Sequence, residues 1–319
     1  MRIDGLDAIE IPDRLNMSLI KARPTDRALR EQVSLGLCGL GFSEIVTNSI
    51  TNSKYYGEDQ PLVRMLNSLS SELDVMRPSM LETGLEVVAY NLARRNMDLM
   101  LFDFGHVYAL AEGGFDQSPR LALFSTGMAM QAGIQSKGIM ADGYFLKSAV
   151  ENLIKSSGIR NVVTGYDDAV VNWKWKNKTL CSIEEVLRKK LQAFDIKERT
   201  WYALINWSVW TEAMAGASIT YAEVPRFPAV QRDLALVLDK SVSFANVQRA
   251  TDKLKLQALR SYGLFDVFES EKLGADKKSL ALSYTFQLTD RTLTDAETEA
   301  MMQQLTNVYT KELGAQIRN

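Results

Sequence analysis

The order of predicted elements between Glu223 and Asn319 constrains the fold of this chain more than any other feature. The sequence there predicts strands and two amphipathic helices in an order that fits β-α-β-β-α-β. This order gives a small sheet with both helices on one face, which leaves the other face open to a flat or single-stranded ligand. The region is therefore predicted to be a recognition surface and not an active site.

Two predicted strands show the alternation that separates the faces of such a sheet. In the run 279–288 and in the run 232–239, large apolar side chains alternate with small or polar ones. The inward positions are Leu280, Leu282, Tyr284, Phe286 and Leu288, with Leu234, Leu236 and Leu238; the outward positions are Ser279, Ala281, Ser283, Thr285 and Gln287, with Asp233, Ala235 and Val237. Small polar outward residues would let a nucleic-acid backbone and base edges approach the sheet. The same pattern also fits an ordinary solvated face, so both interpretations stay open.

Both helices of this region have clear end signals. Ser243 is the expected N-cap of the first helix. Thr294 and Glu297 form a T-x-x-E capping box at the start of the second, and Gly314 is expected to end it. Both helices should pack on the inward face of the sheet.

Several short motifs of this region resemble one known family. They are Pro225-Arg226-Phe227-Pro228, Gln231-Arg232-Asp233-Leu234-Ala235, Leu264-Phe265-Asp266-Val267-Phe268, Lys277-Lys278-Ser279-Leu280-Ala281, Phe286-Gln287, Arg291-Thr292-Leu293-Thr294-Asp295 and Gly314-Ala315. In this order they resemble the ferredoxin-fold anticodon-binding domain that ends the beta subunit of bacterial phenylalanyl-tRNA synthetase. The resemblance implies contact with the anticodon of phenylalanine tRNA. Strand alternation then selects Ala235, Ser283, Thr285 and Gln287 on the open face, with Arg226, Phe227, Arg232 and Arg291 near its edges.

The first two thirds of the chain predict an α+β sheet domain that ends near Ala222. Expected elements are a helix over 25–40, a helix after Met76-Arg77-Pro78, a strand over 99–108, a strand over 124–130 and a helix containing Leu146, Val150 and Leu153. A Ser182/Glu185 capping box is expected to open a further helix that carries Ile183, Leu187, Leu191 and Phe194. Gly216-Ala217-Ser218 would mark the exit from this domain.

This part resembles the class II synthetase-like module of the same beta subunit. Arg27 to Thr47 is similar to the first class II motif, which in that family forms an interface between subunits. Arg77-Pro78-Ser79-Met80-Leu81 and Phe104-Gly105-His106-Val107-Tyr108 are similar to the landmarks around the second motif. The predicted fold class is therefore α+β, a class II synthetase-like antiparallel sheet domain followed by a ferredoxin-like domain. The expected limits are 1–222, with 1–20 as the tail of a preceding domain or a linker, and 223–319.

The helix over 25–40 is the expected subunit interface. Its apolar stripe consists of Leu29, Val33, Leu37 and Leu40. This stripe could simply face the domain's own sheet, the usual arrangement for an amphipathic helix. Ala28, Leu35 and Cys38 add apolar character on a second side, and the resemblance implies that the helix meets a partner helix, so contact with a partner through the stripe is the favoured expectation.

The resemblance breaks down where catalysis would require cations. Catalytic class II subunits place an arginine on the ATP α-phosphate after the strand that corresponds to 105–108, and this chain has Ala109 there. No G-x-G-x-x-R string of the third motif follows Gly158. We therefore expect no catalytic residue and no cofactor bound by this chain, with ATP and magnesium used by the full complex.

Composition limits the remaining possibilities. The chain has 319 residues, 46% hydrophobic content, a formal net charge of −2 and no apolar run long enough to cross a membrane. Near-balanced charge argues against binding to nucleic acid through a broad cationic surface. Two cysteines and a single histidine, His106, do not make a metal site, and His106 in an apolar strand is expected to be structural, as are the five tryptophans. No export signal is visible, so a cytoplasmic location is expected.

Taken with these features, the resemblance implies a non-catalytic region of phenylalanine-tRNA ligase. It would dock the catalytic alpha subunit, in an assembly of two alpha and two beta subunits, and hold tRNA for attachment of phenylalanine. The family's editing domain and magnesium ligands would lie upstream of this chain. Without its partner, the exposed helix could form a homodimer. Two alternatives stay open: an assembly module that binds no RNA, and an independent nucleotide-dependent enzyme on the class II-like fold.

Overall fold

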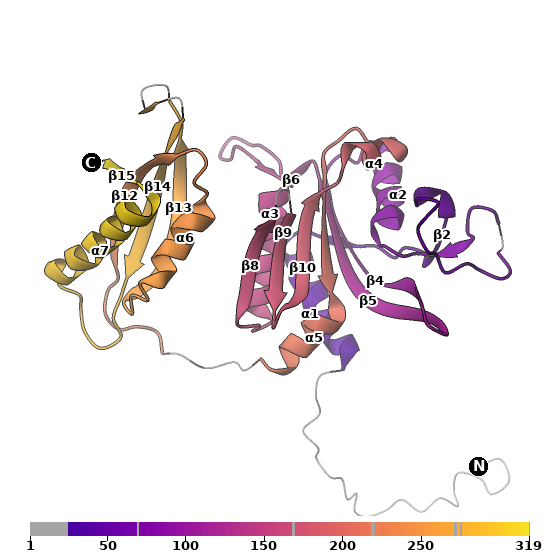
Figure 1. Ribbon diagram of the computed structural model, residues 1–319, viewed down its shortest axis with the longest axis horizontal. Coiled ribbons are helices and arrows are strands. Elements are labelled where there is room, and N and C mark those ends of the chain that lie inside the picture. Colours follow the sequence, from indigo (N-terminus) through magenta and orange to yellow (C-terminus); the bar gives the residue numbers. More distant parts are fainter. Residues whose placement is uncertain are drawn as a thin grey trace, which may run out of the picture. The chain divides into compact units, whose positions relative to one another are not determined.

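The computed structural model describes residues 25–68, 70–167, 170–217, 221, 223–270, 273–274 and 276–318 (Figure 1). The predicted tail at 1–20 and Ser218 lie outside these residues. The chain divides into two units, Met1–Ile219 and Thr220–Asn319, close to the expected limit at 222/223. In the described part of the chain, no helix has the length and apolar character needed to span a bilayer.

The first unit is built on a seven-stranded sheet with the order β1-β4-β5-β11-β10-β9-β8. Its strands are β1 (Ser43–Glu44), β4 (Leu99–Ala111), β5 (Gly114–Thr126), β8 (Val162–Asp167), β9 (Val170–Trp175), β10 (Lys178–Glu185) and β11 (Thr200–Asn206). All neighbours are antiparallel except β1 and β4, which are parallel. Two short ribbons, β2 (Ile50–Thr51) with β3 (Val75–Met76) and β6 (Met128–Met130) with β7 (Ile139–Met140), complete the strands of this unit.

Helices cover both faces of the central strands of this sheet. They are α1 (Asp26–Gly39), α2 (Leu81–Leu92), α3 (Gly143–Ser156), α4 (Arg188–Ala193) and α5 (Trp207–Ala215), with a 3₁₀ turn, η2, at Ser53–Tyr55. Along β5, Leu121 and Leu123 pack with α1, α3 and α5, whereas Ala122 and Phe124 pack with α2 and α4. Since successive strand residues point to opposite faces, one strand contributes to two cores. Trp173, Trp175, Trp207 and Trp210 are buried, as predicted for structural tryptophans.

One predicted element of this unit is wrong, and another is divided into two strands. The residues 182–185 do not open a helix but end β10, in which Cys181 and Ile183 are buried and pair with both β9 and β11. Pairing on both sides outweighs a capping box, which stabilises a helix only locally. The strand expected over 124–130 is instead two strands, the end of β5 and the whole of β6, separated at Gly127, which has φ 74°. Strand β5 also begins earlier, at Gly114, because it pairs with the whole length of β4.

The second unit has the predicted β-α-β-β-α-β order, and the predicted α+β class of the chain is confirmed. Its elements are β12 (Val230–Asp239), α6 (Phe244–Lys253), β13 (Leu259–Phe268), β14 (Lys277–Phe286), α7 (Asp295–Leu313) and β15 (Gln316–Arg318). The sheet order is β13-β14-β12-β15, with every pairing antiparallel. Helices α6 and α7 lie side by side against one face of this sheet (Figure 1).

The core of the second unit confirms the predicted strand parity. Leu236, Leu238, Leu280, Leu282 and Phe286 are buried with residues of both helices. One polar chain crosses this core, where the Tyr284 and Tyr309 hydroxyls lie 2.8 Å apart and the Tyr309 hydroxyl lies 2.5 Å from Thr251 Oγ1. These contacts satisfy hydroxyl groups that would otherwise be buried without partners.

The predicted helix ends of the second unit are also confirmed. Ser243 is the N-cap of α6, although its hydroxyl contacts the Asn246 side chain and not the backbone. Thr294 and Glu297 form the capping box of α7, and Gly314 ends that helix in a left-handed conformation with φ 63°.

Candidate nucleic-acid interface

The face of the second unit's sheet that points away from α6 and α7 carries small polar side chains. In the β12–β14 register, Ala235 is opposite Ala281, Asp233 opposite Ser283 and Gln231 opposite Thr285. These pairs alternate with the buried leucine pairs, so they occupy the opposite face. Gln231 Nε2 donates a 2.7 Å hydrogen bond to Ser283 Oγ, which joins two strands on this open face. Three of the predicted residues, Ala235, Ser283 and Thr285, thus share one surface.

Neighbouring strands extend the open face beyond the predicted residues. On β13, Ser261 is opposite Thr285 and Gly263 is opposite Ser283; on β15, Arg318 is opposite Ala235. All three of these residues are exposed. No sequence signal pointed to them, because β13 contains two register shifts and β15 has only three residues. Both features defeat a simple count of alternating positions.

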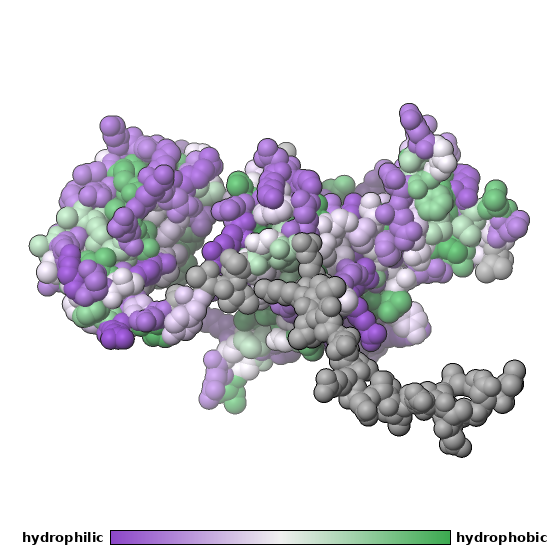
Figure 2. All heavy atoms as spheres, turned by 90° about the horizontal axis from the view of Figure 1, so that it is seen from below, coloured by the Kyte–Doolittle hydropathy of each residue, from purple (hydrophilic) through white to green (hydrophobic). Residues whose placement is uncertain are grey.

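One end of this face is less open than predicted. Val237 and Ser279 are register partners, and their exposed fractions are only 9% and 5%. The predicted outward position of Val237 therefore does not make it accessible. In Figure 2, hydrophilic residues cover much of the visible surface of the second unit, at the left of the picture, with smaller hydrophobic areas between them.

Gln287, the residue after β14, bonds to residues near the starts of β12 and β13. Its Nε2 donates a 2.7 Å hydrogen bond to the Phe227 carbonyl, and its own carbonyl accepts one of 3.1 Å from Arg260 Nε. Gln287 and Phe227 are half-buried, whereas Arg226 is exposed and lies 3.9 Å from Glu223. Of these predicted residues, Arg226 has the most accessible side chain.

Arg232 and Arg291 are not at the edges of the open face as predicted. Arg232 is opposite Tyr284, a residue of the helix-covered core, and its guanidinium lies 3.1 Å from Asp295 at the start of α7. Arg291 makes two hydrogen bonds of 2.6 and 2.8 Å to Glu297. Hydrogen bonds from Arg291, and then from Thr294, lower the pKa of Glu297 to about 2. Both arginines therefore pair with acidic residues in the first turn of α7, where the helix dipole favours negative charge.

The apolar stripe of α1 faces the chain's own core, which corrects the predicted partner contact. Val33 and Leu37 are 2% and 0% exposed and pack with α3 and α5, and Leu29 and Leu40 pack against the same cluster. Val33 and Leu37 are therefore not available to a partner, and Leu29 and Leu40 are half-buried. The opposite side of α1 is open, with Leu35 67% exposed and Cys38 exposed.

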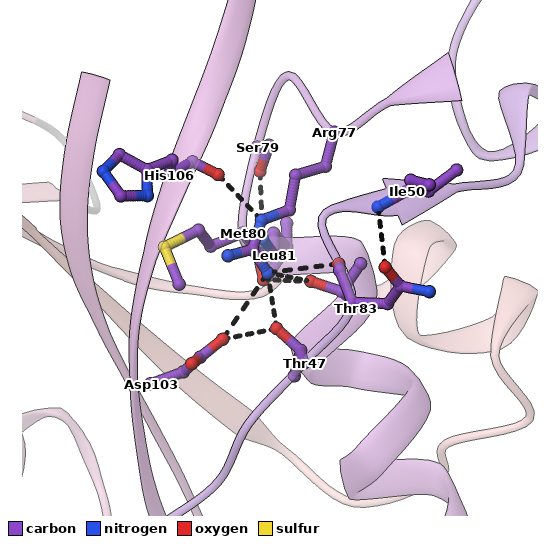
Figure 3. A network of polar contacts seen from close by, with 10 residues as sticks. Thr47, Ile50, Arg77, Ser79, Met80, Leu81, Thr83, Asp103 and His106 are labelled. Carbon is purple, nitrogen blue, oxygen red and sulfur yellow. Dashed lines mark hydrogen bonds and ion pairs between the residues drawn. The ribbon is translucent and has the colours of Figure 1, made fainter. Parts of the chain in front are cut away.

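Arg77, within a motif singled out in the sequence, is the centre of a buried polar network (Figure 3). Its Nε donates to the His106 carbonyl at 2.8 Å, and Nη1 contacts Thr83 Oγ1 at 3.2 Å and Asp103 Oδ2 at 3.5 Å. Thr47 also bonds both Arg77 and Asp103. Burial raises the pKa of Asp103, and its bonds to Thr47 and Arg77 offset this effect only in part. The guanidinium is 1% exposed, so it holds the fold together and does not present a cation to a ligand.

His106 contributes its backbone to this network. Burial, followed by the charges of Arg30 and Arg77, lowers the pKa of its imidazole, which favours the neutral ring. Within the described ranges, no group of three or more His, Cys, Asp or Glu side chains could hold a metal ion.

Comparisons with known proteins agree with this architecture. Residues 225–318 match the family model of the ferredoxin-fold anticodon binding domain, and residues 11–207 match that of the phenylalanyl tRNA synthetase beta chain CLM domain. These two matches define a class, the tRNA synthetases. The chain belongs to the phenylalanyl-tRNA synthetase beta chain family, which confirms the resemblance noted in its motifs.

Similar proteins share this family name. The phenylalanine–tRNA ligase beta subunit of Bacteroides fragilis is 36% identical over 100% of this chain, and that of Streptococcus pneumoniae serotype 4 is 29% identical over 96%. The chain spans only 42% and 41% of these relatives. A solved pyrrolysyl-tRNA synthetase from Desulfitobacterium hafniense has a TM-score of 0.48 and 17% identity, and the match covers 62% of this chain and 75% of that one.

Proposed function

We propose that this chain is the non-catalytic part of a phenylalanine–tRNA ligase that contacts the tRNA anticodon and docks the catalytic alpha subunit. The observation that carries the proposal is the match of 225–318 to an anticodon-binding domain whose open sheet face bears Ala235, Ser283 and Thr285. Small hydroxyl side chains on an exposed sheet face suit single-stranded RNA, because unpaired bases can lie close to the sheet and hydrogen-bond with it.

A positional role agrees with the chemistry of the described residues. Ala109 cannot supply the cation that an ATP α-phosphate requires, and Arg77 is fully used inside the fold. The chain would instead contribute to aminoacylation by orienting tRNA, since holding reactants in place lowers the entropic part of a barrier. ATP and magnesium would be used by the catalytic partner, in a cytoplasmic assembly of two alpha and two beta subunits.

The exposed side of α1 is the surface we assign to the partner. Leu35 and Cys38 lie there, and exposed apolar side chains on a helix favour contact with another helix. The functional division of the chain would be 1–222 for docking and 223–319 for RNA. When the alpha subunit is absent, the same side of α1 would allow a homodimer.

Ser283→Glu tests the proposed RNA contact in the assembled ligase. A carboxylate on the open face repels phosphate, so we expect a rise of about tenfold in the KM for phenylalanine tRNA, equivalent to about 1.4 kcal/mol. Ser241→Glu is the matched control, because Ser241 is exposed in the turn after β12 and lies outside the open face. Unchanged aminoacylation by Ser283→Glu, with both variants folded, would refute the placement and favour an assembly module that binds no RNA.

A further inference from the structure

A polar pocket of about 480 Å³ lies between the C-terminal end of α6 and the first residues of β13. Its polar lining includes Gln248, Asp252, Lys255, Arg260, Ser261 and Tyr262. Lys255 has a left-handed backbone with φ 48°, directly after the residue that caps α6. The chain turns sharply there, and the pocket forms between the helix end and the strand. Its volume is within the range of sites that hold small ligands.

Two cations of this pocket have no acidic partner in the described part of the chain. Neither Lys255 nor Arg260 forms an ion pair there. Arg260 uses Nε for the Gln287 carbonyl at 3.1 Å, which anchors the side chain through one nitrogen. By contrast, the guanidinium groups of Arg232 and Arg291 are paired with acids of α7. The pocket therefore supplies positive charge that the predicted arginines do not offer.

The pocket adjoins the open face through Ser261. This residue is opposite Thr285 on the open face and also lines the pocket. Strand β13 is at the edge of the sheet, next to α6 (Figure 1). A single RNA strand that crosses the open face from β12 over β14 would leave the sheet at this edge, and its backbone would enter the pocket.

A carboxylate is held at the wall of the same pocket. The Tyr262 hydroxyl donates a 2.7 Å hydrogen bond to Asp252 Oδ1, and it also contacts the Gln248 carbonyl at 3.5 Å. Burial, followed by the bond to Asp252, raises the pKa of Tyr262, so its hydroxyl stays protonated and keeps donating. A fixed carboxylate is a hydrogen-bond acceptor that suits a ribose 2′-hydroxyl, the group that distinguishes RNA from DNA.

We propose that this pocket binds the ribose and phosphate of one RNA nucleotide next to the bases on the open face. Lys255 and Arg260 neutralise the phosphate, and Asp252 accepts a hydrogen bond from the 2′-hydroxyl. This assignment rests on the proposed RNA contact of the open face and adds the subsite that secures the backbone.

Charge removal in the full chain tests the phosphate contact. Binding of phenylalanine tRNA is measured over a series of salt concentrations for Lys255→Gln, Arg260→Gln and the control Lys253→Gln. Lys253 is the last residue of α6, two positions before Lys255, and is paired with Glu312 at 2.7 Å. We expect each pocket variant to bind severalfold more weakly and to reduce the slope of log K against log salt by about 0.7 to 1. Pocket variants that behave like Lys253→Gln overturn the assignment.

A second measurement tests the ribose contact and separates the two proposals. Single 2′-deoxy substitutions are introduced through the anticodon loop. We expect one position to weaken binding to the unmodified chain but not to Asp252→Ala, which lacks the side-chain acceptor. Sensitivity at no position, or equal sensitivity in both proteins, refutes the ribose contact. If Ser283→Glu weakens tRNA binding while the pocket variants match their control, only the pocket assignment fails. If neither Ser283→Glu nor the pocket variants weaken tRNA binding, the RNA contact of the open face fails as well.

Discussion

At the scale of single residues, the arginines of this chain differ in burial and in their partners, and the surrounding side chains determine which of them can contact a ligand. Arg77 is buried with Asp103, Arg291 is fixed on Glu297, and Arg260 lines an open pocket. The sequence alone placed Arg232 and Arg291 beside a ligand, because a motif gives the position of a side chain but not its ion-pair partner. Those partners are acids of α7, and only the folded arrangement of strand, loop and helix shows them.

Gly105 allows Arg77 to reach its partners. A Cβ atom at this position would lie 1.8 Å from Arg77 Nη2, so Gly105→Ala must displace the guanidinium. Breaking a buried ion pair costs about 3–5 kcal/mol, and we expect the free energy of unfolding to fall by about that amount in chemical denaturation. Gly114→Ala, where a Cβ atom meets nothing within 4 Å, is the control. Equal stability of the two variants would contradict the role of Arg77.

At the scale of elements, helix α1 shows what periodicity can and cannot predict. Its range follows from the sequence, and the structure adds its N-cap, Thr25, whose Oγ1 accepts a hydrogen bond from the Ala28 amide at 3.2 Å. Periodicity also identified the apolar stripe correctly. It could not say whether that stripe faces the chain's own sheet or a partner, because both surfaces are apolar and both would produce the same spacing.

Two substitutions separate the sides of α1. Leu37→Glu places a charge in a site that is 0% exposed and should prevent stable folding of the first unit. Leu35→Glu changes a side chain that is 67% exposed, so the melting temperature should stay within a few degrees of the original. Co-purification with the catalytic alpha subunit should nevertheless fall for Leu35→Glu. Retained capture by this variant would move the docking surface away from α1.

The capping box of α7 should make the second unit sensitive to acid. The pKa of Glu297 is lowered from 4.5 to about 2, so its contribution to stability is complete above about pH 4.5 and disappears as the pH falls towards 2. We expect Glu297→Gln to lower the melting temperature at pH 7 and to match the original chain near pH 2. A difference that does not change with pH would show that the carboxylate charge plays no part.

Element prediction failed where tertiary pairing overruled local signals. Ser182 and Glu185 have the spacing of a helix start, yet they lie in β10 between two neighbouring strands. The alternation in the second unit succeeded because β12 and β14 are central strands with one buried face and one open face. The edge strand β13, which has bulges and more exposed side chains, gave no comparable pattern.

At the scale of the whole molecule, each unit has a hydrophobic core of its own. Among the described residues, two clusters lie within the first unit, and a third, built around Leu282 and Leu305, lies within the second. The order of elements predicts separate cores, because each segment can bury its own apolar stripes. The pocket beside α6 could not be predicted, since it depends on how a helix end meets an edge strand.

Independent cores predict independent folding. A chain that contains only residues 221–319 should unfold cooperatively, with one transition in both far-UV and near-UV circular dichroism. Its melting temperature should match the corresponding transition of the full chain. A loss of cooperative melting in the short chain, while the full chain keeps it, would show that the second unit requires the first for its stability.

The two register shifts of β13 also affect how well this edge of the sheet could pair with another strand. Phe265, Val267 and Phe268 are 61%, 51% and 48% exposed on a strand that has no neighbour on one side within the described sheet. A straight strand of this composition would be a template for edge-to-edge aggregation. The irregularities next to Arg260 and Phe265 interrupt the regular row of backbone donors and acceptors, so another strand cannot pair along its full length. The bulges thus disfavour fibril growth at this edge.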